Sequence, residues 1–333
     1  MPTLAYYLDT FNPIVLHLWG PISIRWYGLS YLAGFVLAYF IIRHVVRMGR
    51  TTLKVEEIAD MVIAVALGAV LGGRLGYCLF YDPSLLGFVP HFPWWGVLAV
   101  TQGGMASHGG MIGALIGAWI YSRRRGHALG HVMDVVAFGT PTGLFLGRLA
   151  NFVNGELYGR PCPRNFPLAM QFPNEMLHWP MIKWDQFQAL TGNAAAGLDA
   201  QQIINRIIHG DSVLQAAARQ VLTPRYPSQL FEAVAEGIVL FIVLAIVWWK
   251  PRKPWVLGSW FLMAYAILRI TCEFFREPDF QIKSDEYAHW GITRGQVLSV
   301  GIFIAGLIVL VWARRRNVPR LGGWRKHPLP PAQ

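Results

Sequence analysis

The segment LFLGRLANFVNGELYG, residues 144–159, places chemically active side chains at the end of an apolar run. Arg148 and Asn151 lie within one helical turn of each other, and Asn154 and Glu156 follow closely. A permanent cation in an apolar segment is costly unless it has a partner or a function. Arginine also donates paired hydrogen bonds to phosphate and carboxylate groups. The segment therefore predicts an ion pair or an anion-binding site at a helix end.

Composition places these residues in a membrane protein. Hydrophobic residues make up 54% of the 333 residues, and charged residues only 14%, whereas a soluble protein usually carries about a quarter charged residues. The formal net charge of +11 comes from basic residues that cluster between apolar stretches. That clustering is typical of membrane topology, and no nucleic-acid-binding motif accompanies it. The three cysteines lack disulfide or metal-ligand spacing, and we expect them to be small packing residues and not metal ligands.

Several apolar stretches are long enough to cross a bilayer. They lie at residues 22–42, 58–81, 104–122, 131–152, 228–249, 255–275 and 293–313. We therefore predict an all-α protein, a bundle of about seven transmembrane helices that forms a single integral membrane domain over residues 1–333. A polar stretch at 153–227 interrupts the pattern, and we expect an inserted loop region there, partly helical around LDAQQIINRIIHG and SVLQAAARQVL.

Basic residues follow every second apolar stretch. The sequence RRR occurs at 123–125 and again at 314–316, whereas the flank at 81–96 contains no lysine or arginine. Lysine and arginine accumulate on the cytoplasmic side of membranes. This asymmetry predicts a multi-pass protein with its N-terminus outside the cytoplasm, its C-terminus inside, and the loop region 153–227 on the outer side.

Under this topology the polar residues of the apolar stretches gather near their outer ends. Arg74, Arg148 and Arg269 each occupy the outer part of a different stretch. Like charges repel strongly in a medium of low dielectric constant, so they need carboxylates or an anionic ligand. Two explanations stay open, because Glu156 and Glu232 could pair with Arg74 and Arg148 without any ligand.

The sixth apolar stretch carries its own line of polar residues. Tyr265, Arg269 and Glu273 are spaced four residues apart, and Arg276 follows three residues later. Residues with this spacing share one face of a helix. We therefore predict one polar stripe, in which Arg269 and Glu273 could form a simple intrahelical ion pair.

The third apolar stretch combines a histidine with many glycines, in GGMASHGGMIGALIGAW at 103–119. Gly109, Gly113 and Gly117 recur every four residues, which predicts a face for close helix packing. His108 is bracketed by glycine pairs that would let a backbone or a lipid approach the imidazole, a suitable general base. Because no serine-nucleophile or HExxH motif occurs, the pattern favours transfer to an acceptor that brings its own nucleophile.

The stretch GRLANFVNGELYG, residues 147–159, resembles the signature segment of prolipoprotein diacylglyceryl transferases, G-R-x-[GA]-N-F-x-N-x-E-x-x-G. Further blocks resemble this family in order along nearly the whole chain: RWYGLSYLAGF (25–35), LGGRLGYCLFY (71–81), GGMASHGG (103–110), YPSQLFEAVAEG (226–237) and RITCEFFREPD (269–279). Family members often have histidine where this chain has Arg25 and Tyr226. These departures shift the expected role of general base to His108.

The resemblance implies an enzyme of the bacterial inner membrane that needs no cofactor. It would transfer the diacylglyceryl group of phosphatidylglycerol to the lipobox cysteine of a prolipoprotein, which forms a thioether and releases glycerol-1-phosphate. The partners would be phosphatidylglycerol, the signal peptide of the precursor and the lipid bilayer. We expect His108, Arg148 and Arg269 to be catalytic. The expected substrate-binding residues are Tyr27, Arg74, Arg148, Asn151, Asn154, Glu156, Gly159, Glu232, Tyr265, Glu273 and Arg276.

Two other classes of protein share the composition. A transporter or flippase for an anionic lipid or solute would need polar groups on both sides of the bilayer midplane and internal duplication, and the sequence shows neither clearly. A structural scaffold would not need a histidine beside tandem glycines. The role of residues 174–224, which could guide the signal peptide, stays open.

Overall fold

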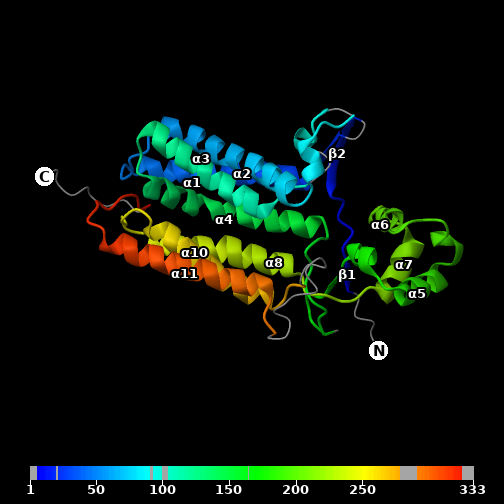
Figure 1. The fold of residues 1–333 in the computed structure, drawn as a ribbon. Coiled ribbons are helices and arrows are strands. Elements are labelled where there is room, and N and C mark those ends of the chain that lie inside the picture. Colours follow the sequence, from blue (N-terminus) through cyan, green and yellow to red (C-terminus); the bar gives the residue numbers. More distant parts are fainter. Residues whose placement is uncertain are drawn as a thin grey trace. The chain divides into compact units, whose positions relative to one another are not determined.

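The computed structural model describes residues 6–19, 22–90, 93–99, 104–163, 165–277 and 291–324, and most of them are helical. The chain divides into two compact units. The first unit comprises residues 1–32, 144–239 and 266–301, and the second comprises residues 33–143, 240–265 and 302–333. Figure 1 labels the helices and strands of both units.

Six helical segments in the described part of the chain are long and apolar enough to cross a membrane: Trp26–Arg47 (α1), Val55–Phe80, Leu129–Val153 (α4), Ser228–Val247, Val256–Glu273 (α10) and Arg294–Arg315 (α11). The regular helix α2 spans Ile58–Phe80 within the second of these. The remaining predicted stretch forms α3, Ser107–Arg125, whose glycines and terminal arginines lower its hydropathy.

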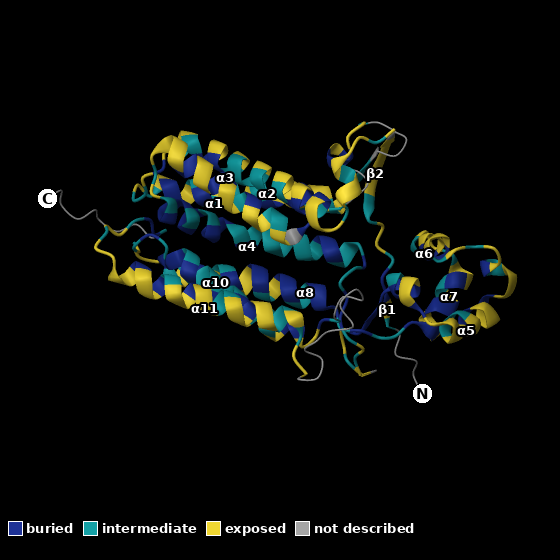
Figure 2. Cartoon of the chain, in the orientation of Figure 1, coloured by how far each residue is buried: buried dark blue, intermediate teal, exposed yellow. Residues whose placement is uncertain are grey.

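Large apolar side chains are exposed along these helices. Leu71 of α2 is 59% exposed and Ile308 of α11 is 63% exposed, and Figure 2 shows exposed residues repeated along both helices. Contiguous apolar surface of this extent is unfavourable in water and favourable against lipid. Together with the six apolar segments, it establishes an all-α, multi-pass membrane protein.

In the second unit, α2 and α3 pack side by side through glycines (Figure 1). A Cβ atom added to Gly113 would clash with the carbonyl oxygen of Gly68 and lie 2.8 Å from its carbonyl carbon. Gly109 and Gly117 meet the α2 backbone in the same way. The predicted packing face is therefore confirmed. The missing side chain of Gly109 makes room for the α2 backbone and not for a lipid. Gly103 lies outside the described residues.

The fifth predicted stretch is not one regular helix. It consists of α8 (Ser228–Glu232), a π-helical segment (Ala233–Val239) and α9 (Leu240–Val247). The wider turns of a π-helix are rare and frequently occur at functional sites. In the same segment, a Cβ atom on Gly237 would lie 2.5 Å from the Cβ of Phe145 in α4. Glycine thus lets the π-helical segment approach α4 closely.

The first unit contains two short pairs of strands. Strand β2 (Ile14–Trp19) pairs antiparallel with β3 (Ile22–Arg25). The prediction of a helix from residue 22 is therefore wrong at its start, because the apolar run continues through this hairpin before α1 begins. Strand β1 (Tyr7–Leu8) pairs in parallel with β4 (Met170–Gln171) and ties the N-terminal segment to the loop region.

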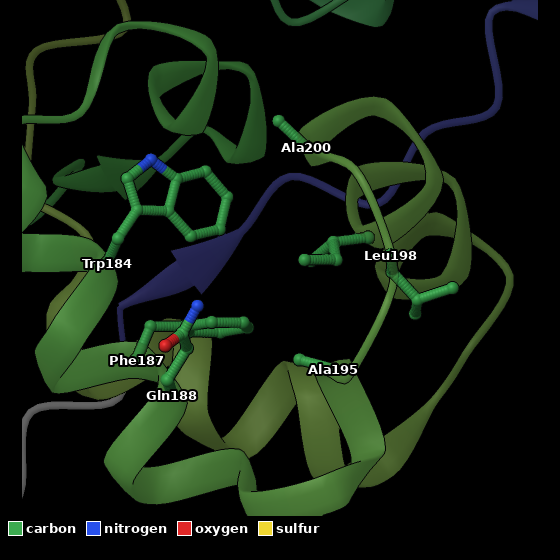
Figure 3. Close-up of a pocket in the computed structure, with 7 residues that line it drawn as sticks. Trp184, Phe187, Gln188, Ala195, Leu198 and Ala200 are labelled. Atoms are coloured by element: carbon green, nitrogen blue, oxygen red, sulfur yellow. The ribbon is translucent and has the colours of Figure 1, made fainter.

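The loop region contains α5 (Met181–Thr191), α6 (Ala200–Ile208) and α7 (Ser212–Val221). The last two confirm the predicted helices. Helix α5 was not predicted, because its apolar residues are not confined to one face. The helices enclose a hydrophobic core that includes Phe187 and Leu214 (Figure 2). A cavity of about 200 Å³ opens beside it (Figure 3).

We expect Gly113→Ala to destabilise the protein, because the added methyl group meets the Gly68 backbone. Overpacking of this kind costs about 1–3 kcal/mol. The matched control is Gly301→Ala in α11, where an added Cβ would meet no atom within 4 Å. Thermal unfolding in detergent should show a lower midpoint for Gly113→Ala alone. Equal midpoints for the two variants would contradict the packing described here.

Candidate active site

The first unit holds a cluster of charged side chains near the ends of α4, α8 and α10. Glu232 lies at its centre. Its carboxylate is 3.0 Å from Nη1 of Arg148, 2.5 Å from Nη1 of Arg269 and 3.4 Å from Nη1 of Arg276. Two of the three predicted intramembrane arginines therefore meet at a single carboxylate. We call Arg148, Glu232, Glu236, Arg269, Glu273 and Arg276 the ion cluster.

Glu236 is a member of the cluster that the sequence analysis missed. Nε and Nη2 of Arg148 both donate to its Oε2 atom, at 3.1 and 3.0 Å. Its Oε1 atom lies 3.7 Å from Nη1 of Arg269. The available signal was its position four residues after Glu232 in an apolar segment, which places both carboxylates toward the same neighbours.

The predicted polar stripe on the sixth stretch is partly correct. Arg269 and Glu273 form an ion pair at 2.9 Å within α10, and the hydroxyl of Thr293 donates to Glu273. Helix α10 ends at Glu273, however, so Arg276 does not share its face. Arg276 instead forms a β-bridge with Gly159, and from there it reaches the cluster.

The cluster combines buried anions with partly accessible cations. The side chains of Glu232 and Glu236 are 0% exposed, whereas Arg148 and Arg269 are 15% and 14% exposed. Buried carboxylates thus fix the two guanidinium groups, while each arginine side chain remains partly exposed. Preorganised donors of this kind stabilise negative charge without reorganisation when it develops.

The signature segment folds into a turn next to the cluster. Asn151 donates from Nδ2 to the hydroxyl oxygen of Tyr27. Asn154 donates from Nδ2 to Oε1 of Glu156 at 2.8 Å, and Nε2 of Gln229 donates to the backbone carbonyl of Glu156 at 2.8 Å. Burial raises the pKa of the Glu156 carboxyl, and the bond from Asn154 opposes this rise only in part.

Gly159 closes this turn because no larger residue fits. Its N–H donates to the carbonyl of Tyr226 at 3.0 Å. An added Cβ would clash with that carbonyl and would lie 2.6 Å from the carbonyl oxygen of Phe275. Gly159 therefore allows two neighbouring backbone segments to approach, which explains the glycine that ends the signature.

Arg74, in the second unit, bonds to the backbone of the segment before α3. Its buried guanidinium donates to the carbonyls of Gly96, Val97, Ala99 and Gly104, at 2.5, 2.9, 3.2 and 3.0 Å. Backbone carbonyls of the segment before α3 thus accept hydrogen bonds from its guanidinium group. A substrate contact for Arg74 stays a prediction.

Three further residues of interest, His108, Tyr265 and Tyr226, each have different neighbours. His108 is the second residue of α3, and its side chain is exposed. Tyr265 in α10 stacks on Phe261, with ring centroids 6.0 Å apart. Tyr226, which stands where family members often have histidine, packs its ring against an aromatic group that includes Phe275. No group of three or more metal-ligating side chains occurs in the described ranges.

These features define a class of protein, a multi-pass helical membrane protein whose signature turn adjoins a buried cluster of arginines and glutamates. A sequence profile of the family described as prolipoprotein diacylglyceryl transferase matches residues 13–312. The chain belongs to this family.

Curated relatives agree with the family match over almost their full length. A phosphatidylglycerol–prolipoprotein diacylglyceryl transferase of Bdellovibrio bacteriovorus is 40% identical, over 95% of this chain and 96% of the relative. Proteins of the same name are 37% identical in Psychrobacter arcticus, over 92% and 95% of the two chains, and 38% identical in Salmonella arizonae, over 95% and 98%. All three are named as transferases.

We expect Glu232→Gln to destabilise the protein more than Glu273→Gln. Glu232 pairs with three arginines, and removing one partner of a buried ion pair costs about 3–5 kcal/mol. Among the described residues, Glu273 forms an ion pair with one arginine, Arg269, and glutamine can still accept the bond from Thr293. Thermal unfolding of both variants in the same detergent checks this order. An equal or smaller loss for Glu232→Gln would mean that Glu232 is not the central anion.

Proposed function

We propose that the protein transfers the diacylglyceryl group of phosphatidylglycerol to the thiol of a lipobox cysteine in prolipoproteins. The observation that carries this proposal is the ion cluster, in which two buried carboxylates fix the partly exposed Arg148 of the signature segment. The lipid phosphate is the anion that this side chain would bind, because a guanidinium donates to phosphate in a bidentate manner. Family membership agrees with this function.

The reaction needs a base, an electrophilic carbon and a stabilised leaving group. His108 takes the proton of the cysteine thiol, whose ordinary pKa of about 8.5 leaves it mostly protonated at neutral pH. The sulfur attacks the glycerol carbon that carries the phosphate. A C–S bond forms, the C–O bond breaks, and the electron pair leaves with glycerol-1-phosphate. Arg148 and Arg269 stabilise the charge that grows on the departing phosphate.

The remaining predicted residues support the lipid headgroup in this proposal. Asn151 and Tyr27, which are hydrogen-bonded to each other, contact headgroup oxygens, and Tyr265 does the same. Glu273 and Arg276 hold the guanidinium of Arg269 and the Glu232 carboxylate in place.

We place the protein in the bacterial inner membrane, with its N-terminus in the periplasm and its C-terminus in the cytoplasm. The basic flanks at 123–125 and 314–316 support this orientation. The ion cluster and the loop region then lie toward the periplasm, where precursors displaying a lipobox are accessible. The transporter alternative is not favoured, because the matched relatives are named as transferases.

Mass spectrometry tests the reaction directly. Purified protein, phosphatidylglycerol and a lipobox peptide are incubated together, and the peptide should gain the mass of one diacylglyceryl group on its cysteine. A peptide with Cys→Ser should stay unmodified, because it lacks the thiol. Absence of any mass gain across several detergents and in lipid vesicles would reject the proposed function.

Lysine substitutions test the role of the guanidinium groups. We expect Arg148→Lys and Arg269→Lys to lower the transfer rate by about a hundred- to a thousand-fold, because lysine keeps the charge but loses the bidentate geometry. Arg206→Lys is the matched control, since Arg206 is 49% exposed and pairs with Asp211 in the loop region. Unchanged transfer rates for both Arg148→Lys and Arg269→Lys would show that bidentate binding of the phosphate does not limit the rate.

His108→Gln tests the general base. We expect a loss of about a hundred- to ten-thousand-fold, the usual contribution of general base catalysis, and the loss should shrink as the pH approaches the pKa of the free thiol. His209→Gln is the control, because His209 is exposed and bonds to the neighbouring backbone of Asn205 in the loop region. Rates followed from pH 6 to 9 give the comparison. Full activity of His108→Gln at pH 6 would remove His108 as the base.

A further inference from the structure

A cavity of about 330 Å³ lies in the second unit, where α4 and α10 begin and where the chain leaves α11. Apolar side chains, among them Leu129, Val318 and Leu321, form most of its wall, and Arg316 is the charged residue of the lining. Every described residue of this lining belongs to the second unit, whereas the ion cluster belongs to the first. The cavity is therefore a separate feature that the proposed reaction does not use.

Hydrogen bonds fix the chain segment that follows α11 beside this cavity. Leu321 forms a β-bridge with Arg252, and its N–H donates to the carbonyl of Arg252 at 2.7 Å. The ammonium group of Lys253 donates to the carbonyls of Arg314 and Arg316, at 2.9 and 2.6 Å. These bonds attach the segment to the residues that precede α10, so the cavity is a preformed part of the fold.

Trp255 lines the cavity in an unusual backbone conformation. Its φ of 79° lies in the left-handed region, which is uncommon for residues other than glycine. Its indole lies against Gly130, where an added side chain would clash with it, and its ring centroid is 6.4 Å from that of Trp312 in α11. Strained residues cluster at ligand sites, and tryptophan is enriched where a membrane meets water. The two indoles therefore mark this end of the bundle as a membrane interface.

One face of α11 leads along the helix to Arg316. Ile304, Ile308 and Trp312 are spaced four residues apart, so they share this face, and all three are exposed (Figure 2). The guanidinium carbon of Arg316, four residues beyond Trp312, lies 4.7 Å from the centre of its ring. An apolar stripe suited to lipid contact thus ends at a cation and at the cavity.

The charge of Arg316 is not balanced by a neighbouring carboxylate. In the described part of the chain its guanidinium contacts the ring of Trp312 and forms no ion pair, whereas Arg125 pairs with Asp60. Two further arginines precede Arg316 in the run at 314–316. An anion is therefore the complementary ligand, and basic pockets between membrane helices bind anionic lipid headgroups.

We propose that this cavity binds an anionic phospholipid of the surrounding membrane, in the cytoplasmic leaflet under the orientation given above. The phosphate meets Arg316, and the glycerol backbone lies against the apolar wall of the cavity. One acyl chain follows the exposed face of α11 past Trp312 and Ile308. The lipid is held here as a bound partner and not as a substrate, because none of the lining residues takes part in the proposed reaction.

Native mass spectrometry of the full-length protein in detergent tests the site with two lipids. Phosphatidic acid and phosphatidylcholine with identical acyl chains both carry a phosphate, but only phosphatidic acid has a net negative charge. We expect preferential retention of phosphatidic acid. Arg316→Gln should lower its affinity by about 10-fold, the effect of losing one charge-assisted hydrogen bond. Phosphatidic acid held elsewhere is common to all variants, so the difference between titrations isolates the lipid bound through Arg316.

Two substitutions separate the cavity from its charged surroundings. Arg315→Gln removes the same charge from the neighbouring residue, which does not line the cavity. It should leave the affinity within about twofold, because a charge that acts only through solvent is screened. Ala128→Trp keeps every charge and adds a large side chain at an exposed position of the cavity wall, so it should weaken binding. Ala216→Trp, at an exposed position of α7, is its control.

Any of four results would overturn the proposal. They are equal retention of the two lipids by the unmodified protein, an equal loss of affinity in Arg315→Gln and Arg316→Gln, unchanged binding in Ala128→Trp, and displacement of phosphatidic acid by excess inorganic phosphate. The last result would assign the cation to a soluble anion. Because no peptide is present, the measurement does not depend on turnover, and failure of the proposed transfer reaction would leave it intact.

Discussion

The structure of the candidate site depends on one interaction, the shared carboxylate of Glu232. Three arginines from different parts of the first unit reach this side chain, which is wholly buried. Gathering such cations in a medium of low dielectric constant is prohibitive without a fixed anion among them. Glu232 therefore permits α4, α8 and the end of α10 to meet, and it determines where their guanidinium groups are held.

The backbone around Glu232 also helps to bring the charged side chains together. A π-helical segment begins directly after it and contains Glu236, which supplies the second anion for Arg148. Gly237 removes the side chain that would keep α4 away. Gly159 likewise lets the chain around Arg276 come close to the signature turn. Small residues and an irregular helix are thus what bring charged groups from distant sequence positions together.

Local spacing predicted a large part of this site, and non-local bonding accounts for the rest. The pairing of Arg269 with Glu273 followed from their separation by four residues in one helix. The partner of Arg74 could not be predicted, because four backbone carbonyls have no side-chain signature. Arg276 was assigned to a helical face because the sequence does not show that α10 ends at Glu273.

The fold, like the site, could be predicted from the sequence only in part. Apolar length predicted the membrane helices within a few residues, since the thickness of a bilayer sets that length. It could not separate β3 from α1, because strand and helix share one apolar run. Helix α5 escaped prediction because both of its faces carry apolar residues.

The ion cluster also has a consequence for thermodynamic linkage. Its three arginines are matched by three glutamates, so the formal charges of the cluster sum to zero, and a bound phosphate would make it anionic. A net charge is expensive in this environment, so binding of a phosphate to the cluster, as proposed, would be coupled either to protonation of a glutamate or to movement of one carboxylate out of the cluster. In the first case, the phosphate and hydrogen ions would bind cooperatively, and affinity for the phosphate would rise as the pH falls.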